Sequence, residues 1–101
     1  MAETIIENIT PQQARELLAQ KTIEILDVRT SAEYQKQHLP NAINIDFYLP
    51  NFLELLAQLD PSKTYLVHCR SGGRSTKTVY LMSQLHFRYL YNVQGFLFPE
   101  P

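Results

Sequence analysis

The segment VHCRSGGRS, residues 67–75, contains the single cysteine of this 101-residue chain, Cys69. A glycine pair within it reaches backbone angles that other residues adopt only with strain, and a tight loop of this kind turns successive N–H groups inward to bind an anion. Such a loop favours the thiolate, the nucleophilic form of cysteine. We therefore assign the catalytic role to Cys69. Substrate binding is assigned to the six residues that follow it: Arg70, Ser71, Gly72, Gly73, Arg74 and Ser75.

The strand and helix expected around this loop place it at the carboxyl end of a parallel strand, where α/β proteins have their active sites. TYLVHC (64–69) is typical of a strand buried on both faces, and a helix is expected from Ser75 to about Leu85. In open parallel sheets, ligands bind beyond the carboxyl ends of the strands, and the start of a helix adds N–H donors and partial positive charge. Cys69 ends one of these strands, so chemistry is expected there.

The rest of the chain alternates between strand and helix patterns. Thr10 and Gln13 are expected to form a capping box around Pro11, and Ser31 to cap a second, short helix. This alternation predicts one α/β domain over residues 1–101, with a parallel sheet covered by helices on both faces. The expected strands are 4–9, 23–28, 41–45, 64–69 and 88–93, and the expected helices begin near residues 11, 31, 50 and 75.

The composition excludes several classes of protein. Nine basic and ten acidic residues give a net charge of −1, so no overall field favours nucleic acid or a membrane surface. No apolar run approaches the roughly 18 residues of a membrane span. The start MAETIIENIT lacks a secretory pattern, and a single cysteine cannot form an internal disulfide. We expect a cytoplasmic protein, a monomer or weak dimer, with no nucleic-acid or membrane partner.

A second motif, ILDVRTSAEYQKQHLPNAINI (25–45), precedes the cysteine loop. The two motifs, in this order, resemble the single-domain rhodaneses, and the resemblance spans nearly the whole chain. It implies a three-layer fold with a five-stranded, mostly parallel sheet. It also implies sulfur transfer through a persulfide on Cys69, cradled by residues 70–74. The donor would be a small anion such as thiosulfate, and the acceptor an external thiol, cyanide or a protein.

The upstream motif is expected to support the site. Arg29 and Glu33 lie four residues apart and are expected to pair across one helical turn, while Asp27 and His38 tie loops together near the site. His68 is interpreted as a hydrogen-bonded strand-end residue on the face opposite Cys69, rather than its base. The three histidines lack metal-site spacing, so no metal and no cofactor are expected.

The chain departs from the family pattern at several positions. Gln37 and Asn41 stand where relatives usually have glycine; asparagine tolerates left-handed angles, but glutamine is harder to explain. Downstream, NVQGFLFPEP (92–101) replaces the usual glycines and tryptophan, with Gly95 expected to keep the turn. Phe96 and Phe98 are expected either to fill the wall of the pocket or to cover the core.

Three other functions remain as alternatives. Cysteine-dependent phosphatases share the His-Cys, glycine-bearing loop and Arg-Ser pattern, but they need five residues between Cys and Arg, and this chain has four, residues 70–73. Arsenate reductases normally use further thiols. A non-catalytic or sulfur-relay module of the same fold is the third alternative, although such interaction modules usually lack the cysteine.

Overall fold

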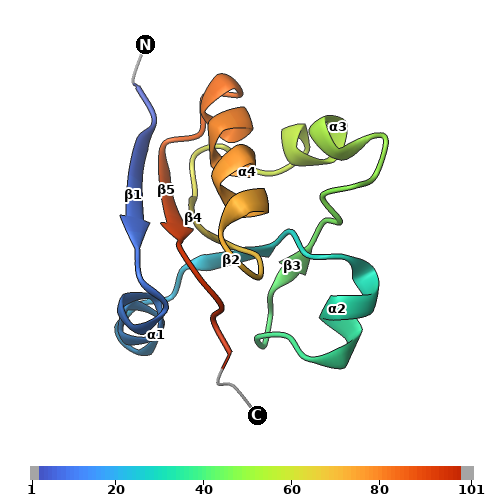
Figure 1. Ribbon diagram of the computed structural model, residues 1–101. Helices are drawn as coiled ribbons and strands as arrows, with labels where there is room; N and C mark the ends of the chain where they lie inside the picture. Colours follow the sequence, from blue (N-terminus) through green and yellow to red (C-terminus); the bar gives the residue numbers. More distant parts are fainter. Residues whose placement is uncertain (1–2, 99–101) are drawn as a thin grey trace.

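A five-stranded sheet runs through the computed structural model, which describes residues 3–98 (Figure 1). The strand order is β1-β5-β4-β2-β3, and all four strand pairs are parallel. The strands are β1 (Ile5–Ile9), β2 (Glu24–Asp27), β3 (Ile43–Asn44), β4 (Thr64–His68) and β5 (Tyr89–Val93). The helices are α1 (Pro11–Gln20), α2 (Ser31–Lys36), α3 (Phe52–Ala57) and α4 (Gly73–Gln84). The predicted α/β class with a five-stranded parallel sheet is confirmed.

Two hydrophobic clusters, one on each face of the sheet, give the protein three layers. On one face, α3 and α4 pack with Leu56 and Met82 against Tyr65 and Val67 of β4. On the other face, α1 packs against Leu66 of the same strand. Successive side chains of a strand point to opposite faces, so β4 supplies both clusters. Within residues 3–98, no helix is long and apolar enough to cross a bilayer.

Local capping sets where the first two helices begin. The predicted capping box of α1 is present: the Thr10 hydroxyl accepts the Gln13 N–H at 3.1 Å, and Gln13 accepts the Thr10 N–H at 2.9 Å. The cap of α2 is Thr30, so the expectation that Ser31 caps it is wrong. Thr30 and Glu33 form a reciprocal capping box, with bonds of 3.2 and 3.0 Å, and this pattern outcompetes a cap one residue later.

Several element ends differ from the predicted ones. The central strand β4 ends at His68, so Cys69 already belongs to the loop. Helix α4 begins at Gly73, two residues before the predicted start, because Gly72 adopts a left-handed φ of 98° and its carbonyl accepts the Thr76 N–H at 3.0 Å. The third strand keeps only Ile43–Asn44 of the predicted five residues.

Candidate active site

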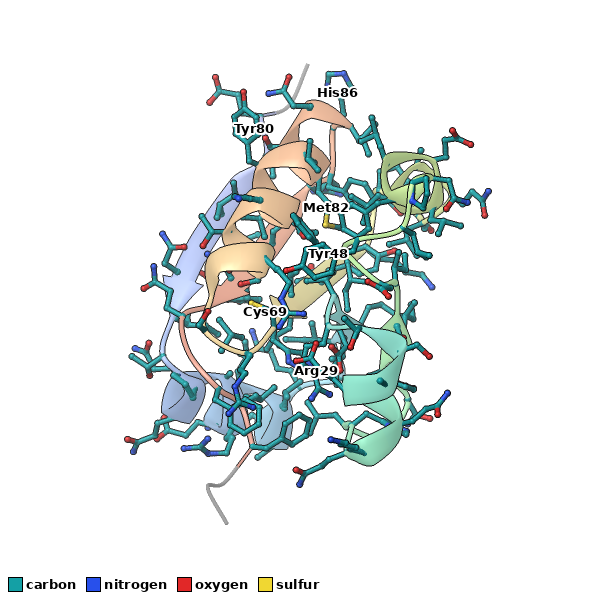
Figure 2. All side chains as sticks on the ribbon, turned by 45° about the vertical axis from the view of Figure 1, so that its right-hand side comes forward. Arg29, Tyr48, Cys69, Tyr80, Met82 and His86 are labelled. Atoms are coloured by element: carbon teal, nitrogen blue, oxygen red, sulfur yellow. The ribbon has the colours of Figure 1, made fainter. Side chains whose placement is uncertain are left out.

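The thiol of Cys69 lies inside the loop between β4 and α4 and is 1% exposed. Its Sγ accepts the backbone N–H of Gly72 at 3.2 Å and that of Ser75 at 3.3 Å. Both donors belong to the start of α4, which adds the positive end of the helix dipole. Figure 2 shows Cys69 at this end of α4, with His86 at the opposite end. The loop therefore stabilises negative charge on or next to the sulfur.

The two glycines of this loop have different tasks. Gly72 needs its left-handed φ, and a Cβ there would also lie 3.4 Å from the Cα of Gln94. Gly73 has no positive φ, and a Cβ there would meet nothing closer than the Ser71 hydroxyl at 4.0 Å. The buried Ser75 hydroxyl lies 3.1 Å from the Gly72 carbonyl and fixes it to the helix. Left-handed freedom is thus required at one glycine, not at both as expected.

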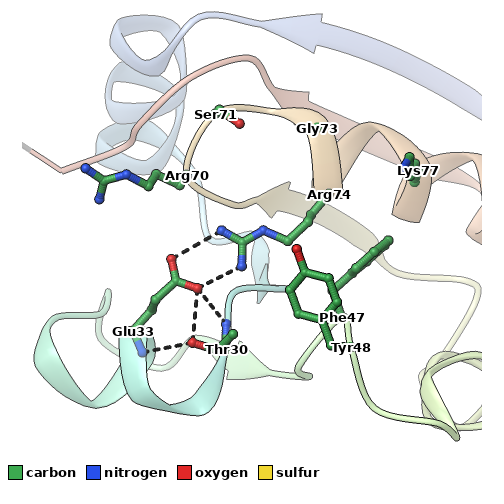
Figure 3. Close-up of a pocket in the computed structure, with 9 residues that line it drawn as sticks. All are labelled: Thr30, Glu33, Phe47, Tyr48, Arg70, Ser71, Gly73, Arg74 and Lys77. Atoms are coloured by element: carbon green, nitrogen blue, oxygen red, sulfur yellow. Dashed lines mark hydrogen bonds and ion pairs between the residues drawn. The ribbon is translucent and has the colours of Figure 1, made fainter.

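The guanidinium of Arg74 pairs with Glu33 of α2 rather than pointing into the loop (Figure 3). Its two nitrogens donate to the two carboxylate oxygens at 2.7 and 3.2 Å. Hydrogen bonding from Arg74, aided by Thr30 and opposed by burial, lowers the pKa of Glu33 from 4.5 to about 2, and the same carboxylate raises the pKa of Arg74. Arg74 therefore anchors the loop to α2, and its charge is largely neutralised for substrate binding.

Arg29 forms a buried ion pair with Asp27, so the predicted pairing of Arg29 with Glu33 is wrong. Arg29 is 3% exposed and Asp27 is fully buried, with Nη2 of Arg29 2.7 Å from Oδ2 of Asp27. Arg29 precedes the cap of α2, so the four-residue spacing is not a helical turn. Its Nη2 also donates to the Gln37 carbonyl at 2.6 Å. Asp27 therefore holds Arg29, and Arg29 in turn holds the C-terminal end of α2 at Gln37.

The two unusual residues of this motif have simple explanations. Gln37 is extended, with φ −163°, so this position needs no glycine. Asn41 has a φ of 64°, the left-handed conformation that asparagine tolerates. Asn44, which the sequence argument did not single out, donates to the carbonyls of Asp27 and Arg29 at 2.9 and 3.0 Å. It therefore holds the same loop from the side of β3.

His38 and His68 meet the predictions only in part: His68 is the last residue of β4, as predicted, but the predicted hydrogen bond is missing. His38 lies outside the pocket lining: its Nδ1 is 2.8 Å from the Tyr34 carbonyl, and its ring stacks on the Tyr34 ring at 3.8 Å. His68 is fully buried, and among the described residues neither ring nitrogen has a hydrogen-bond partner, so the predicted hydrogen bond is absent there. Burial lowers the pKa of His68, against the raising effect of Asp27, whose Oδ2 lies 3.7 Å from Nε2.

The two phenylalanines of the C-terminal segment lie in different surroundings. Phe98 is buried, with its ring centroid 4.9 Å from the guanidinium carbon of Arg29 and 5.9 Å from the His68 ring. Phe98 therefore covers core, one of the two expected outcomes. Phe96 is half-buried, and the guanidinium carbon of Arg70 lies over its ring at 4.9 Å. It supports Arg70 without itself lining the pocket.

An open pocket of about 590 Å³ lies beside the cysteine loop, between α2, α4 and the segment after β3 (Figure 3). Of the six residues predicted to bind substrate, Arg70, Ser71, Gly73 and Arg74 line this pocket. Gly72 and Ser75 do not line it, and their backbone N–H groups donate to Sγ of Cys69. Of the other lining residues, the sequence argument named Glu33 as a supporting residue and missed Thr30, Phe47, Tyr48 and Lys77. Lys77 was detectable, because it lies one helical turn after Arg74; Phe47 and Tyr48 follow β3 and carried no signal. The lining residues are Thr30, Glu33, Phe47, Tyr48, Arg70, Ser71, Gly73, Arg74 and Lys77.

Comparison with known proteins agrees with this geometry. The chain is 30% identical over 93 residues to the thiosulfate sulfurtransferase GlpE of Pseudomonas savastanoi, covering 91% of this chain and 84% of that protein. It is 29% identical to a tRNA uridine(34) hydroxylase of Aster yellows witches'-broom phytoplasma, of which it covers only 30%. The crystal structure of a rhodanese-like domain protein from Staphylococcus aureus superposes with a TM-score of 0.77 at 27% identity, covering 90% of this chain and 87% of that one. Residues 10–98 match the model of the rhodanese-like domain, and the chain therefore belongs to the rhodanese-like domain family.

Proposed function

We propose that this protein is a thiosulfate sulfurtransferase that carries sulfur as a persulfide on Cys69. The observation that carries the proposal is the pair of backbone N–H groups, from Gly72 and Ser75, directed at Sγ within 3.3 Å. These donors stabilise a thiolate before the reaction and a persulfide anion after it. The likeness to a protein named thiosulfate sulfurtransferase supports the choice of donor.

In the first step, the Cys69 thiolate attacks the outer sulfur of thiosulfate. An S–S bond forms between Sγ and that sulfur, the bond between the two sulfurs of the donor breaks, and its electron pair leaves with sulfite. Arg70 is the loop cation free to hold the donor, because Arg74 is paired with Glu33. The N–H groups at the start of α4 need not move as the charge shifts to the persulfide, which is electrostatic preorganisation.

In the second step, a nucleophile removes the outer sulfur and regenerates the Cys69 thiolate. Cyanide gives thiocyanate, and a thiolate gives a new persulfide. Because the chain has one cysteine, no second thiol of the same chain can resolve the intermediate. The acceptor is therefore external, a small thiol or a protein thiol, and the reaction is of the ping-pong type. We place this chemistry in the cytoplasm, in a monomer or weak dimer, without metal or cofactor.

The size of the loop favours sulfur transfer over phosphate or arsenate chemistry. Four residues separate Cys69 from Arg74, and two N–H groups converge on Sγ itself. A phosphoryl group in transfer needs donors for three equatorial oxygens, hence a wider ring. Arg74, which would have to contact that group, is held by Glu33. A purely non-catalytic module would not need a thiol held by two N–H groups.

The direct test is mass spectrometry of the intact protein after exposure to thiosulfate. We expect a gain of one sulfur atom, removed by cyanide with release of thiocyanate. The Cys69→Ser variant should neither gain the sulfur nor transfer it, while its circular dichroism and unfolding midpoint stay close to those of the wild type. Gln84→Ala, at the far end of α4, is the matched control and should transfer sulfur normally. Transfer by Cys69→Ser within tenfold of the wild-type rate would exclude the persulfide route.

A further inference from the structure

The pocket beside the cysteine loop is larger than thiosulfate requires. Its volume of about 590 Å³ falls within the range of about 300–1,000 Å³ that is typical of sites for organic ligands. A small inorganic ion held at the loop would leave most of this space to water. The part of the pocket away from the loop is therefore available to the body of a larger donor.

The charges in the pocket are arranged around the Arg74–Glu33 pair. These two residues largely cancel each other, and Figure 3 shows Arg70 and Lys77 to either side of them. Among residues 3–98, neither Arg70 nor Lys77 makes an ion pair with a carboxylate. Arg70 belongs to the loop, whereas Lys77 lies on α4 four residues beyond Gly73, about 6 Å along the helix at 1.5 Å per residue. The pocket thus offers two separate positions for negative charge.

Two aromatic rings line the space on the side facing α4. The Phe47 ring is held from below by Phe52 of the core, with their centroids 5.1 Å apart. Tyr48 packs edge-on against Phe47 at 5.4 Å and is itself 67% exposed, with Arg74 5.8 Å from its ring. An exposed ring held by a partly buried neighbour costs little conformational entropy when a ligand covers it, and flat aromatic groups pack well on such a surface.

We propose that Phe47, Tyr48 and Lys77 form a second subsite that takes the body of an organic sulfane-sulfur donor, preferably an aromatic one with a distal carboxylate. This inference rests on the proposed function and names its donor class. With an aryl thiosulfonate, the Cys69 thiolate bonds to the terminal sulfur, the sulfur–sulfur bond of the donor breaks, and its electron pair leaves with the aryl sulfinate. We place the ring along Tyr48 and a para carboxylate at Lys77, which lies about 6 Å along α4 from Gly73.

The kinetic test compares four donors: thiosulfate, methanethiosulfonate, benzenethiosulfonate and 4-carboxybenzenethiosulfonate. The ratio of kcat/KM for benzenethiosulfonate to that for thiosulfate should fall about three- to tenfold in Tyr48→Ala. Because each ratio is compared between variants, the intrinsic reactivities of the donors cancel. Tyr80→Ala, which removes a similarly exposed tyrosine of α4 outside the pocket lining, should leave the ratio unchanged.

The gain in kcat/KM that a carboxylate on the donor provides tests the role of Lys77. The gain from benzenethiosulfonate to its 4-carboxy derivative should be about two- to fivefold in the wild type and absent in Lys77→Met. Lys36→Met, which removes an exposed lysine at the end of α2, should keep the gain. An equal loss with all donors in Tyr48→Ala, or a carboxylate gain that survives in Lys77→Met, would overturn the second subsite.

A binding measurement separates this inference from the proposed function. Titration of Cys69→Ser with benzenesulfinate and 4-carboxybenzenesulfinate requires no sulfur transfer. We expect saturable binding that weakens at least threefold when Tyr48→Ala is added. Absence of binding would overturn the subsite even if thiosulfate is a good donor. Conversely, binding without a persulfide from any donor would retain the subsite and refute the sulfurtransferase.

Discussion

Replacing Glu33 by glutamine should destabilise the protein through one contact, the ion pair with Arg74. Glu33 also accepts the Thr30 N–H in the capping box of α2. Glutamine is a good third residue of a capping box, so Glu33→Gln keeps the cap. It removes the charge and also the carboxylate oxygen that accepts from Nη2 of Arg74, because the amide nitrogen that replaces this oxygen is a donor. Glu33→Ala removes the cap as well and should cost about 1 kcal/mol more. The comparison of these two variants separates the cap from the ion pair.

The expected size follows from the carboxylate's pKa. A displacement from 4.5 to about 2 corresponds to about 3 kcal/mol, at about 1.4 kcal/mol for each pH unit. The Glu33 side chain is 30% exposed, so screening by solvent reduces this figure. We expect Glu33→Gln to lower the free energy of unfolding by about 1–2 kcal/mol at pH 7. The exposed Lys63–Glu24 pair, 3.4 Å apart, is the control, and Glu24→Gln should cost less than about 0.5 kcal/mol.

The stabilisation by the Glu33 ion pair should be lost as the pH falls. The pKa of Glu33 is lower in the folded protein than in the unfolded chain, so the unfolded chain takes up the proton first as the pH falls. The stabilisation is therefore complete above about pH 5 and is lost as the pH falls toward 2. The difference between wild type and Glu33→Gln should be constant from pH 7 to 5 and less than half as large at pH 3.

Urea unfolding followed by circular dichroism, repeated at several pH values, measures this difference directly. Comparison with the variant cancels the titration of the other carboxylates. A difference that stays constant down to pH 3 would show that the loss has nothing to do with ionisation of Glu33. No loss at pH 7 would show that the ion pair contributes nothing to stability.

Two further predictions concern the loop and the buried histidine. Gly72→Ala should destabilise the protein by about 1–2 kcal/mol and reduce sulfur transfer, because alanine is strained at φ 98° and displaces an N–H donor to Cys69. Gly73→Ala should be at least as stable as the wild type, and equal unfolding midpoints for the two variants would contradict this prediction. Between pH 7 and pH 5, the free energy of unfolding of His68→Leu should rise relative to that of the wild type by roughly 1 kcal/mol. Burial lowers the pKa of His68, so the unfolded wild-type chain takes up the proton first as the pH falls below about 6.5; parallel stability curves from pH 7 to 5 would refute this.

The features that could be predicted from the sequence depend on local patterns. The capping box of Thr10 and Gln13 needs only a spacing of three residues, and β4 is recognisable because it is apolar on both faces. The position of Cys69 between this strand and α4 follows from the same order of elements. A turn that needs glycine was placed correctly, but special backbone freedom was expected at both glycines. The pattern could not show that Gly73 already belongs to α4 and that only Gly72 takes the left-handed angle.

The features that could not be predicted depend on contacts between distant residues. Two arginines could pair with Glu33. Arg29, near in sequence, instead forms a buried ion pair with Asp27, so Glu33 pairs with Arg74, 41 residues away. Spacing along the chain cannot reveal that competition, because it is decided by which charge is buried. The role of Tyr48 could not be predicted for a similar reason. This exposed tyrosine lines the pocket only because α2 and α4 pack around the loop.

The pairing of β1 with β5 has a consequence for how the protein folds during synthesis. The side-chain oxygen of Asn8 in β1 accepts a hydrogen bond from the side-chain amide of Asn92, 84 residues later, at 2.9 Å. β1 therefore leaves the ribosome before its partner β5, and Ile5 and Ile6 are unpaired until β5 follows. Long-range parallel pairing is slow, and an unpaired apolar strand is a site of misassociation. Ribosome-bound chains should thus acquire protease resistance only after β5 has cleared the exit tunnel.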